Sequence, residues 1–236
     1  MKYDKELFNN VLTKYNIAPT GNIRVDFESI LAHYDIESIF NDLYVFGILA
    51  KILPEFLPCI DLDQKTLHHC YTVDKHIFKT VKNIALTPNL SKDNKHLLLW
   101  AALLHDIGKP NALRHNLKKG RHHFTNHASF SAKMSCKILS RFGFGLKEIL
   151  HIKKLVQHHE FFRYIKLYNM GDKGNRMSTG YVIKTIKKVG IDNFKLLIIL
   201  HRADLMAQSE HFRESKLLIN KRAQNILDYY ISTNNK

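Results

Sequence analysis

An apolar run that ends in two polar residues lies near the middle of the chain. Residues 97–104 are all hydrophobic, and His105 and Asp106 follow them directly. A helix that is apolar on nearly every side has to be buried. Gly108 and Pro110 come next, so we expect the helix to stop here beside a cavity. An unpaired carboxylate in such a place is costly, and a metal ion would satisfy His105 and Asp106 together.

The rest of the chain favours helices. Hydrophobic residues are mostly three or four positions apart, only five prolines and ten glycines interrupt them, and no strand-like alternation of useful length is present. We therefore expect an all-α protein with one compact domain, a helical bundle. The expected helices are 5–15, 27–34, 37–53, 72–86, 92–107, 126–142, 146–160, 179–189, 193–208 and 214–231.

We expect residues 1–55 to form an N-terminal helical segment that packs on a main domain, 56–236. The polar, glycine-containing stretch 168–178 is either a lid over a site or a plain connection. No apolar run approaches the roughly 20 residues of a membrane span. The three cysteines form no C-x-x-C pattern and the first residues lack a secretory signal, which points to the reducing cytoplasm.

The formal net charge is +15. A strongly basic chain favours polyanionic partners such as RNA, DNA or phosphorylated small molecules. A lysine-rich composition would produce the same charge without any nucleic-acid partner. The charge therefore suggests nucleotides or RNA, with tRNA among them, but does not establish them.

Two further polar residues should face the core. Asp204 follows Leu197 by seven positions and Leu200 by four, so it continues the inward face of its helix. His76 borders the apolar stripe of the 72–86 helix. A single inward histidine is more often structural than a metal ligand. An HD dipeptide combined with inward His and Asp residues on separate helices is much rarer by chance, and it indicates a metal site.

Three more histidines are candidates for the same site. His127 shares a helix face with hydrophobic residues, and Asn126 could cap that helix. His159 follows Val156 and other apolar residues at helical spacing, whereas His158 lies on the neighbouring face. His159 is thus the stronger candidate of the adjacent pair.

The order of these motifs resembles the H...HD...D signature of the HD-domain phosphohydrolase superfamily. His76 in YTVDKH is followed by His105 and Asp106 in LWAALLHDIGKP and by Asp204 in RADL. With HFTNHASFSAKMSCKIL and KKLVQHH, the series is similar to the HD domain attached to bacterial CCA-adding tRNA nucleotidyltransferases and related poly(A) polymerases. The likeness extends from about Leu53 to Gln208.

This resemblance implies an all-helical HD fold with a divalent metal at His76, His105, Asp106 and Asp204. It also implies hydrolysis of phosphomonoesters or phosphodiesters, including 2',3'-cyclic phosphates and 2'-nucleotides. In binuclear relatives, histidines at places similar to His127 and His159 bind a second metal. This chain has Thr72 where some of those relatives carry a glutamate ligand, so one or two ions are expected.

Imidazole and carboxylate ligands together suit Mn, Fe, Co or Ni, and Mg is also possible. Such a metal would activate a bound water for attack on phosphorus, with Asp106 orienting the water. Lys109 in the HDIGK motif is the expected phosphate-contacting cation, although it could merely be a charge at a helix C-terminus. The expected substrate contacts beyond the ligands are Arg121, His123 and Arg202.

The resemblance has a limit, because residues 1–60 contain no G-S turn and no paired aspartates on a sheet. Nucleotide addition is therefore not expected of this chain. Two alternatives to a hydrolase remain. One is a non-catalytic module that binds tRNA-like or single-stranded RNA, and the other is a structural partner of a separate nucleotidyltransferase. The ligand set argues against the binding module, because a module kept only for binding need not keep four inward polar residues that cost stability. In the structural partner, the metal would only brace the fold.

Overall fold

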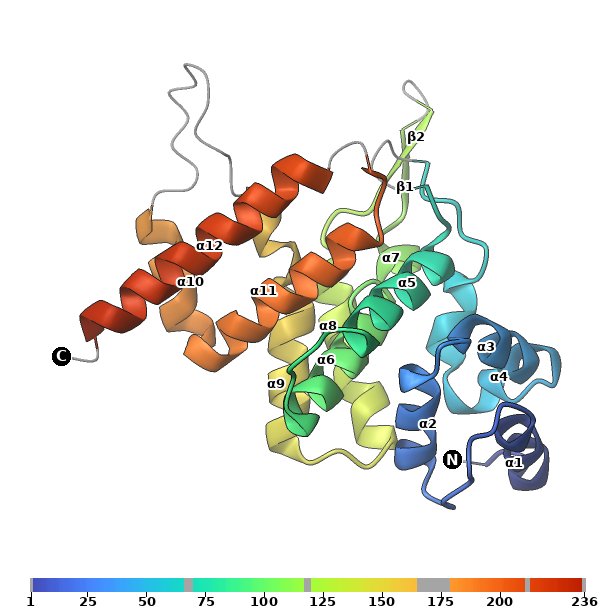
Figure 1. Cartoon of the computed structure of the whole chain (residues 1–236). Helices are drawn as coiled ribbons and strands as arrows, with labels where there is room; N and C mark the ends of the chain where they lie inside the picture. Colours follow the sequence, from blue (N-terminus) through green and yellow to red (C-terminus); the bar gives the residue numbers. More distant parts are fainter. Residues whose placement is uncertain (1, 66–69, 117–119, 165–178, 211–212, 235–236) are drawn as a thin grey trace.

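The computed structural model describes residues 2–65, 70–116, 120–164, 179–210 and 213–234. Within these ranges the chain is almost entirely helical, so the all-α prediction is confirmed (Figure 1). The elements are α1 Lys5–Lys14, α2 Ile23–Ala32, α3 Ile36–Val45, α4 Leu49–Ile52, η1 Pro54–Cys59, α5 Val73–Ala85, α6 Lys92–Leu104, α7 Lys109–Ala112, β1 Arg114–Asn116, β2 Arg121–His123, α8 His127–Arg141, α9 Leu146–His158, η2 His159–Tyr164, α10 Thr179–Val189, α11 Ile191–Met206 and α12 Arg213–Asn234.

Helices α5, α6, α8, α9 and α11 form the centre of the molecule. Helix α5 packs against α6 and α11, and α9 packs against α6, α8 and α11. Helices α1–α4 lie on one side of this centre, and α10 and α12 lie on the other (Figure 1). One continuous hydrophobic core includes residues from both sides. No helix of the described residues has the length and apolar character that a bilayer crossing requires.

Local sequence explains where several helices begin. Asp4 accepts a hydrogen bond from the backbone N–H of Leu7, Asn22 from that of Arg24, and Ser91 from that of Asn94. Such N-caps satisfy backbone donors that have no partner inside the helix. The Asn22 cap also explains why α2 begins four residues before the predicted start at residue 27.

Trp100 connects three parts of the fold. It is completely buried in α6, and its ring lies 5.6 Å from that of Phe27 in α2 and 4.9 Å from that of Phe142 after α8. Its indole N–H donates to Glu28, 3.3 Å away. Burial of a tryptophan among aromatic rings contributes several kcal/mol to stability, roughly 3–5 by the cost of truncation. Trp100 therefore fixes α6, and with it the position of the residues that follow α6.

The structure corrects three local predictions. The predicted helix 37–53 is interrupted, because α3 ends at Val45 and Gly47 adopts φ +69° before α4 begins. A short antiparallel hairpin, β1–β2, was not predicted, since three residues per strand are too few to produce a periodic signal. Pro110 lies in the first turn of the short helix α7 instead of only preventing continuation of α6.

The predicted role of Gly108 as a helix stop is also wrong. Its φ is −87°, which other residues adopt readily. A Cβ at Gly108 would instead collide with the backbone N of Ser131 and the backbone O of His127. Glycine is therefore required for close packing on α8. The stretch 168–178, predicted to be a lid or a connection, lies outside the described residues.

Candidate metal centre

Six polar side chains from five elements meet in the interior. His76 projects from α5, His105 and Asp106 follow the end of α6, and Asp204 lies in the last turns of α11. His127 is the first residue of α8, and His159 stands where α9 passes into η2. The central packing of α5, α6, α8, α9 and α11 brings these positions together. All but Asp204 are at most 5% exposed.

The first cluster consists of His76, His105 and Asp204. The Nε2 atoms of His76 and His105 lie 3.3 Å apart, and Oδ1 of Asp204 lies 3.0 Å from Nε2 of His76. One ligand atom from each residue lies within 4.8 Å of those of the other two. A single divalent ion could therefore contact all three side chains.

The second cluster consists of His127, His159 and Asp106. The two Nε2 atoms lie 3.1 Å apart. Oδ1 of Asp106 lies 3.1 Å from Nε2 of His127 and 3.6 Å from Nε2 of His159. Although it faces these two nitrogens, this oxygen is buried and accepts no hydrogen bond within the described part of the chain. A buried carboxylate oxygen in this position is suited to a cation.

Asp106 joins the two clusters. While its Oδ1 faces the second cluster, its Oδ2 lies 3.2 Å from Nε2 of His105 and 3.4 Å from Nε2 of His76. One carboxylate thus presents one oxygen to each cluster. Asp106 could therefore offer a ligand atom to a metal ion at either cluster.

Backbone carbonyls orient the imidazoles of both clusters. The Nδ1 atoms of His105, His127 and His159 lie 2.7, 2.8 and 2.7 Å from the carbonyl oxygens of Ala102, Phe124 and Val156. Carbonyl oxygens only accept, so each Nδ1 carries a proton, and in the neutral form of the ring the lone pair of Nε2 points inward. Facing lone pairs at 3.1–3.3 Å repel one another unless a cation lies between them. The donor set therefore fits divalent metal.

The electrostatics of the centre favour positive charge. Burial alone would raise the pKa of Asp106, but the neighbouring His105 and Lys109 hold it well below its ordinary value. Burial is likewise outweighed at Asp204, where His76 keeps the pKa well below its ordinary value. The proximity of Asp106 raises the pKa of His159 despite burial. Both carboxylates therefore stay ionised and favour a cation in the centre.

A family model described as the HD domain matches residues 66–230, well over half of the chain. This chain belongs to the HD-domain family. The HD superfamily consists of metal-dependent phosphohydrolases, and the resemblance found in the sequence motifs is confirmed. The two clusters described above contain His76, His105, Asp106 and Asp204, the four residues of the H...HD...D signature.

The curated relatives of this chain are much longer proteins, and the chain aligns with only a part of each. A bifunctional uridylyltransferase/uridylyl-removing enzyme of Ruegeria pomeroyi is 28% identical over 58% of this chain and 15% of its own length. One from Mycobacterium tuberculosis is 32% identical over 48% of this chain and 12% of its own length. An A-adding tRNA nucleotidyltransferase of Deinococcus radiodurans is 27% identical over 58% of this chain and 31% of its own length. The aligned part thus covers less than a third of each relative.

Lys109 lies beside the clusters and is only 4% exposed. Its ammonium group lies 2.6 Å from Oδ2 of Asp106 and donates to Oε1 of Gln64, also at 2.6 Å. The side chain is therefore an internal partner of Asp106 and not a surface charge at a helix end. Gln64 is completely buried and donates in turn to the carbonyl oxygen of Tyr71. Sequence reasoning missed Gln64, which lies outside any regular helix and gives no periodic signal.

Other predicted site residues lie outside the clusters. Arg121 and His123 are exposed on β2, and Arg202 is exposed on α11. His158 is half-buried beside the second cluster but is not part of it. Burial and the nearby charge of Lys188 lower its pKa, so the ring is neutral near pH 7. Thr72 is also separate, since its hydroxyl donates to Oδ1 of Asp74 at 2.5 Å.

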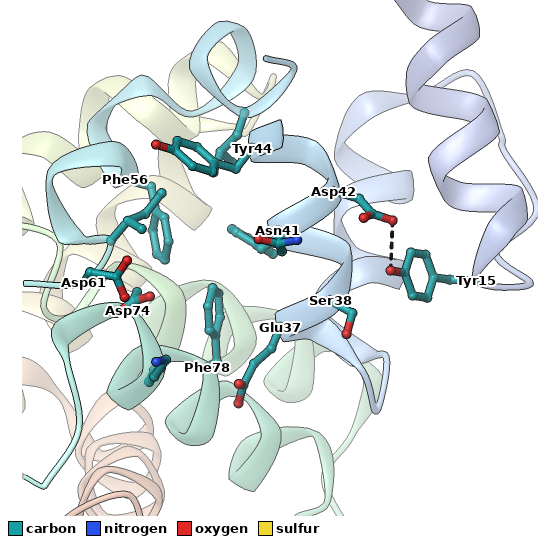
Figure 2. Close-up of a pocket in the computed structure, with 14 residues that line it drawn as sticks. Tyr15, Glu37, Ser38, Asn41, Asp42, Tyr44, Phe56, Asp61, Asp74 and Phe78 are labelled. Carbon is teal, nitrogen blue, oxygen red and sulfur yellow. Dashed lines mark hydrogen bonds between the residues drawn. The ribbon is translucent and has the colours of Figure 1, made fainter. Parts of the chain in front are cut away.

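A cavity of about 520 Å³ lies between α3 and α5 (Figure 2). The charged residues of its walls are mainly acidic, since Glu37, Asp42, Asp61 and Asp74 line it with Lys75 as their cationic counterpart. Like charges disfavour an anionic ligand in such a cavity. The cavity is therefore unsuited to a phosphoester substrate, although Asp74 and Lys75 directly precede His76.

Proposed function

We propose that this HD domain is a metal-dependent phosphohydrolase that cleaves phosphoesters of nucleotides or of RNA ends. The observation that carries the proposal is the bridging position of Asp106 between two three-residue clusters. Substrates of the 2',3'-cyclic phosphate, 2'-nucleotide and phosphomonoester types follow from the family resemblance. Relatives named uridylyl-removing enzymes add nucleotidyl phosphodiesters to the substrates worth testing.

In this proposal His76, His105, Asp106 and Asp204 would hold one divalent ion, and His127 and His159 would hold a second one together with Asp106. The mixed nitrogen and oxygen ligands suit Mn, Fe, Co or Ni, with Mg possible. Bound ions of this kind supply Lewis-acid activation of a phosphoryl oxygen and of water.

The protein's own residues position and neutralise charge. The carbonyl-bound Nδ1 atoms keep the imidazoles in one tautomer, so that no reorientation is needed when substrate arrives. Lys109 keeps Asp106 ionised, and Gln64 fixes the ammonium group. Two of the three N–H bonds of Lys109 are thus used, and the third can be donated to a phosphoryl oxygen. We assign Lys109 this contact in addition to its role beside Asp106.

The decisive experiment starts from protein stripped of metal and reloaded separately with Mn, Fe, Co, Ni, Mg or Zn. Each form is assayed on 2',3'-cyclic nucleotides, 2'- and 3'-nucleotides, and bis-p-nitrophenyl phosphate. We expect metal-dependent turnover that Asp106→Ala abolishes. Asp192→Ala is the matched control, since the Asp192 side chain is 94% exposed on α11. If no metal supports turnover while tRNA or single-stranded RNA still binds, the chain is a binding module instead.

A further inference from the structure

A second cavity, of about 310 Å³, lies between α10 and the junction of α9 and η2. Small-molecule sites range from about 300 to 1,000 Å³, so this cavity suits a ligand near the small end of that range. The two histidines of the second cluster, His127 and His159, do not line this cavity. Its chemistry has therefore to be judged from its own walls.

One wall is cationic. Lys184 and Lys188 line the cavity from α10, and their spacing of four places them on the same helix face. Both are exposed, and neither forms an ion pair within the described residues. Like charges at this spacing repel each other slightly, and an anion between them removes that repulsion. The wall is thus suited to a phosphate group.

The adjoining wall is aromatic. Tyr181 lies one turn before Lys184 on α10, and its ring stacks on Phe161 with centroids 5.4 Å apart and planes at 17°. Phe161 is buried and fixed, whereas Tyr181 remains 42% exposed. An exposed ring held flat by a stacking partner offers a surface for a planar base.

The cavity and the second cluster are adjacent. Ala128 lines the cavity and directly follows His127, while His158 and Glu160 line it on either side of His159. Glu160 is the acidic member of these walls, but its carboxylate lies 3.7 Å from Nδ1 of His127. Lys184 and Lys188 thus oppose this single carboxylate, and the charged side chains of the described walls sum to a net positive charge that favours an anion.

We propose that this cavity binds a nucleoside monophosphate group, with the base on Tyr181 and the phosphate between Lys184 and Lys188. The inference rests on the proposed function and deepens it, because it makes a nucleotide the substrate class. Binding can be measured without turnover. A failure of this inference is therefore distinguishable from a failure of the hydrolase proposal.

The test is calorimetric titration of the full chain with adenosine and uridine 5'-monophosphates and with inorganic phosphate. Lys184→Ala with Lys188→Ala should weaken binding of all three ligands more than about tenfold, since each lysine provides a charge-assisted contact. Lys187→Ala is the matched control, because Lys187 is exposed on the same helix but does not line the cavity. It should leave the dissociation constants unchanged.

Tyr181→Ala should weaken the nucleotides about tenfold but not inorganic phosphate, and Tyr181→Phe should restore nucleotide binding. Binding should also persist in a His105→Ala, Asp204→Ala protein, whose first cluster is removed. Nucleotide binding that is lost in that protein but unaffected by the double lysine substitution would belong to the metal centre and overturn the proposal. So would the absence of measurable binding to the unmodified chain at millimolar nucleotide.

Discussion

The ammonium group of Lys109 lies 2.6 Å from the Oδ2 atom of Asp106, and both side chains are at most 4% exposed. A buried ion pair has paid a large desolvation cost, so removal of one partner leaves the other charge unsatisfied. The pair also places positive charge next to the carboxylate that faces both clusters. Lys109 should therefore matter for stability and for activity together.

Lys109→Met should lower the free energy of unfolding by about 3 kcal/mol, the typical cost of breaking a buried pair. It should also lower kcat/KM by about 100-fold, because a positive charge near the phosphoryl group is lost. Chemical denaturation and steady-state kinetics on the metal-loaded protein measure the two effects. Lys187→Met, on the surface of α10, should change neither quantity. Full activity in Lys109→Met would exclude the proposed phosphate contact.

Gly108→Ala should displace the start of α8, because the new Cβ would meet backbone atoms of Ser131 and His127. We expect a loss of about 1–3 kcal/mol in unfolding free energy and weaker metal binding at the second cluster. Gly145→Ala is the matched control. Its Cβ would meet only Glu148 Oε2, at an ordinary 3.6 Å. Equal stability of the two variants would show that α8 can move without cost.

Metal content should depend on which cluster is altered. His159→Ala should reduce bound metal from about two ions per chain to one, since His159 belongs to the second cluster only. Asp106→Ala should reduce the metal bound at both clusters, because each oxygen of Asp106 faces a different cluster. Elemental analysis after reloading and dialysis gives the ratio. If the unmodified protein and His159→Ala both bind one ion per chain, metal binds at the first cluster only.

Glu28 supplies a stability test that is independent of metal. It is partly buried against Arg24, His96 and Trp100, and these partners lower its pKa although burial opposes them. A lowered pKa in the folded state gives stability above the unfolded pKa of about 4.3, and this stability is lost as pH falls through the folded value. Glu28→Gln should therefore cost about 1 kcal/mol at pH 7 and progressively less below pH 4.

Thermal or denaturant unfolding between pH 3 and 7 measures this difference. Glutamine can still accept the indole hydrogen bond of Trp100, so only the charge is removed. Glu37→Gln is the comparison, since Glu37 lies on α3 with no ion pair among the described residues. A stability loss in Glu28→Gln that is the same at pH 3 and pH 7 would contradict the assignment to charge.

The sequence alone determined the helical class and most members of the centre. Hydrophobic spacing predicts the helices because one helix face repeats every three to four residues. The same periodicity indicates that His76, His127, His159 and Asp204 face inward, and the HD dipeptide marks the end of a buried helix. These patterns involve residues close together in the sequence, so they can be recognised without knowledge of the fold.

Only the tertiary structure decided which inward residues meet. The division into two clusters, and the orientation of one Asp106 oxygen to each, depend on how five helices cross. Gln64 and the packing role of Gly108 likewise depend on contacts between residues 45 and 23 positions apart. Periodicity predicts which residues share a helix face, but it does not predict which other helix packs against that face. For that reason the sequence indicated a metal site, and the fold decided its geometry.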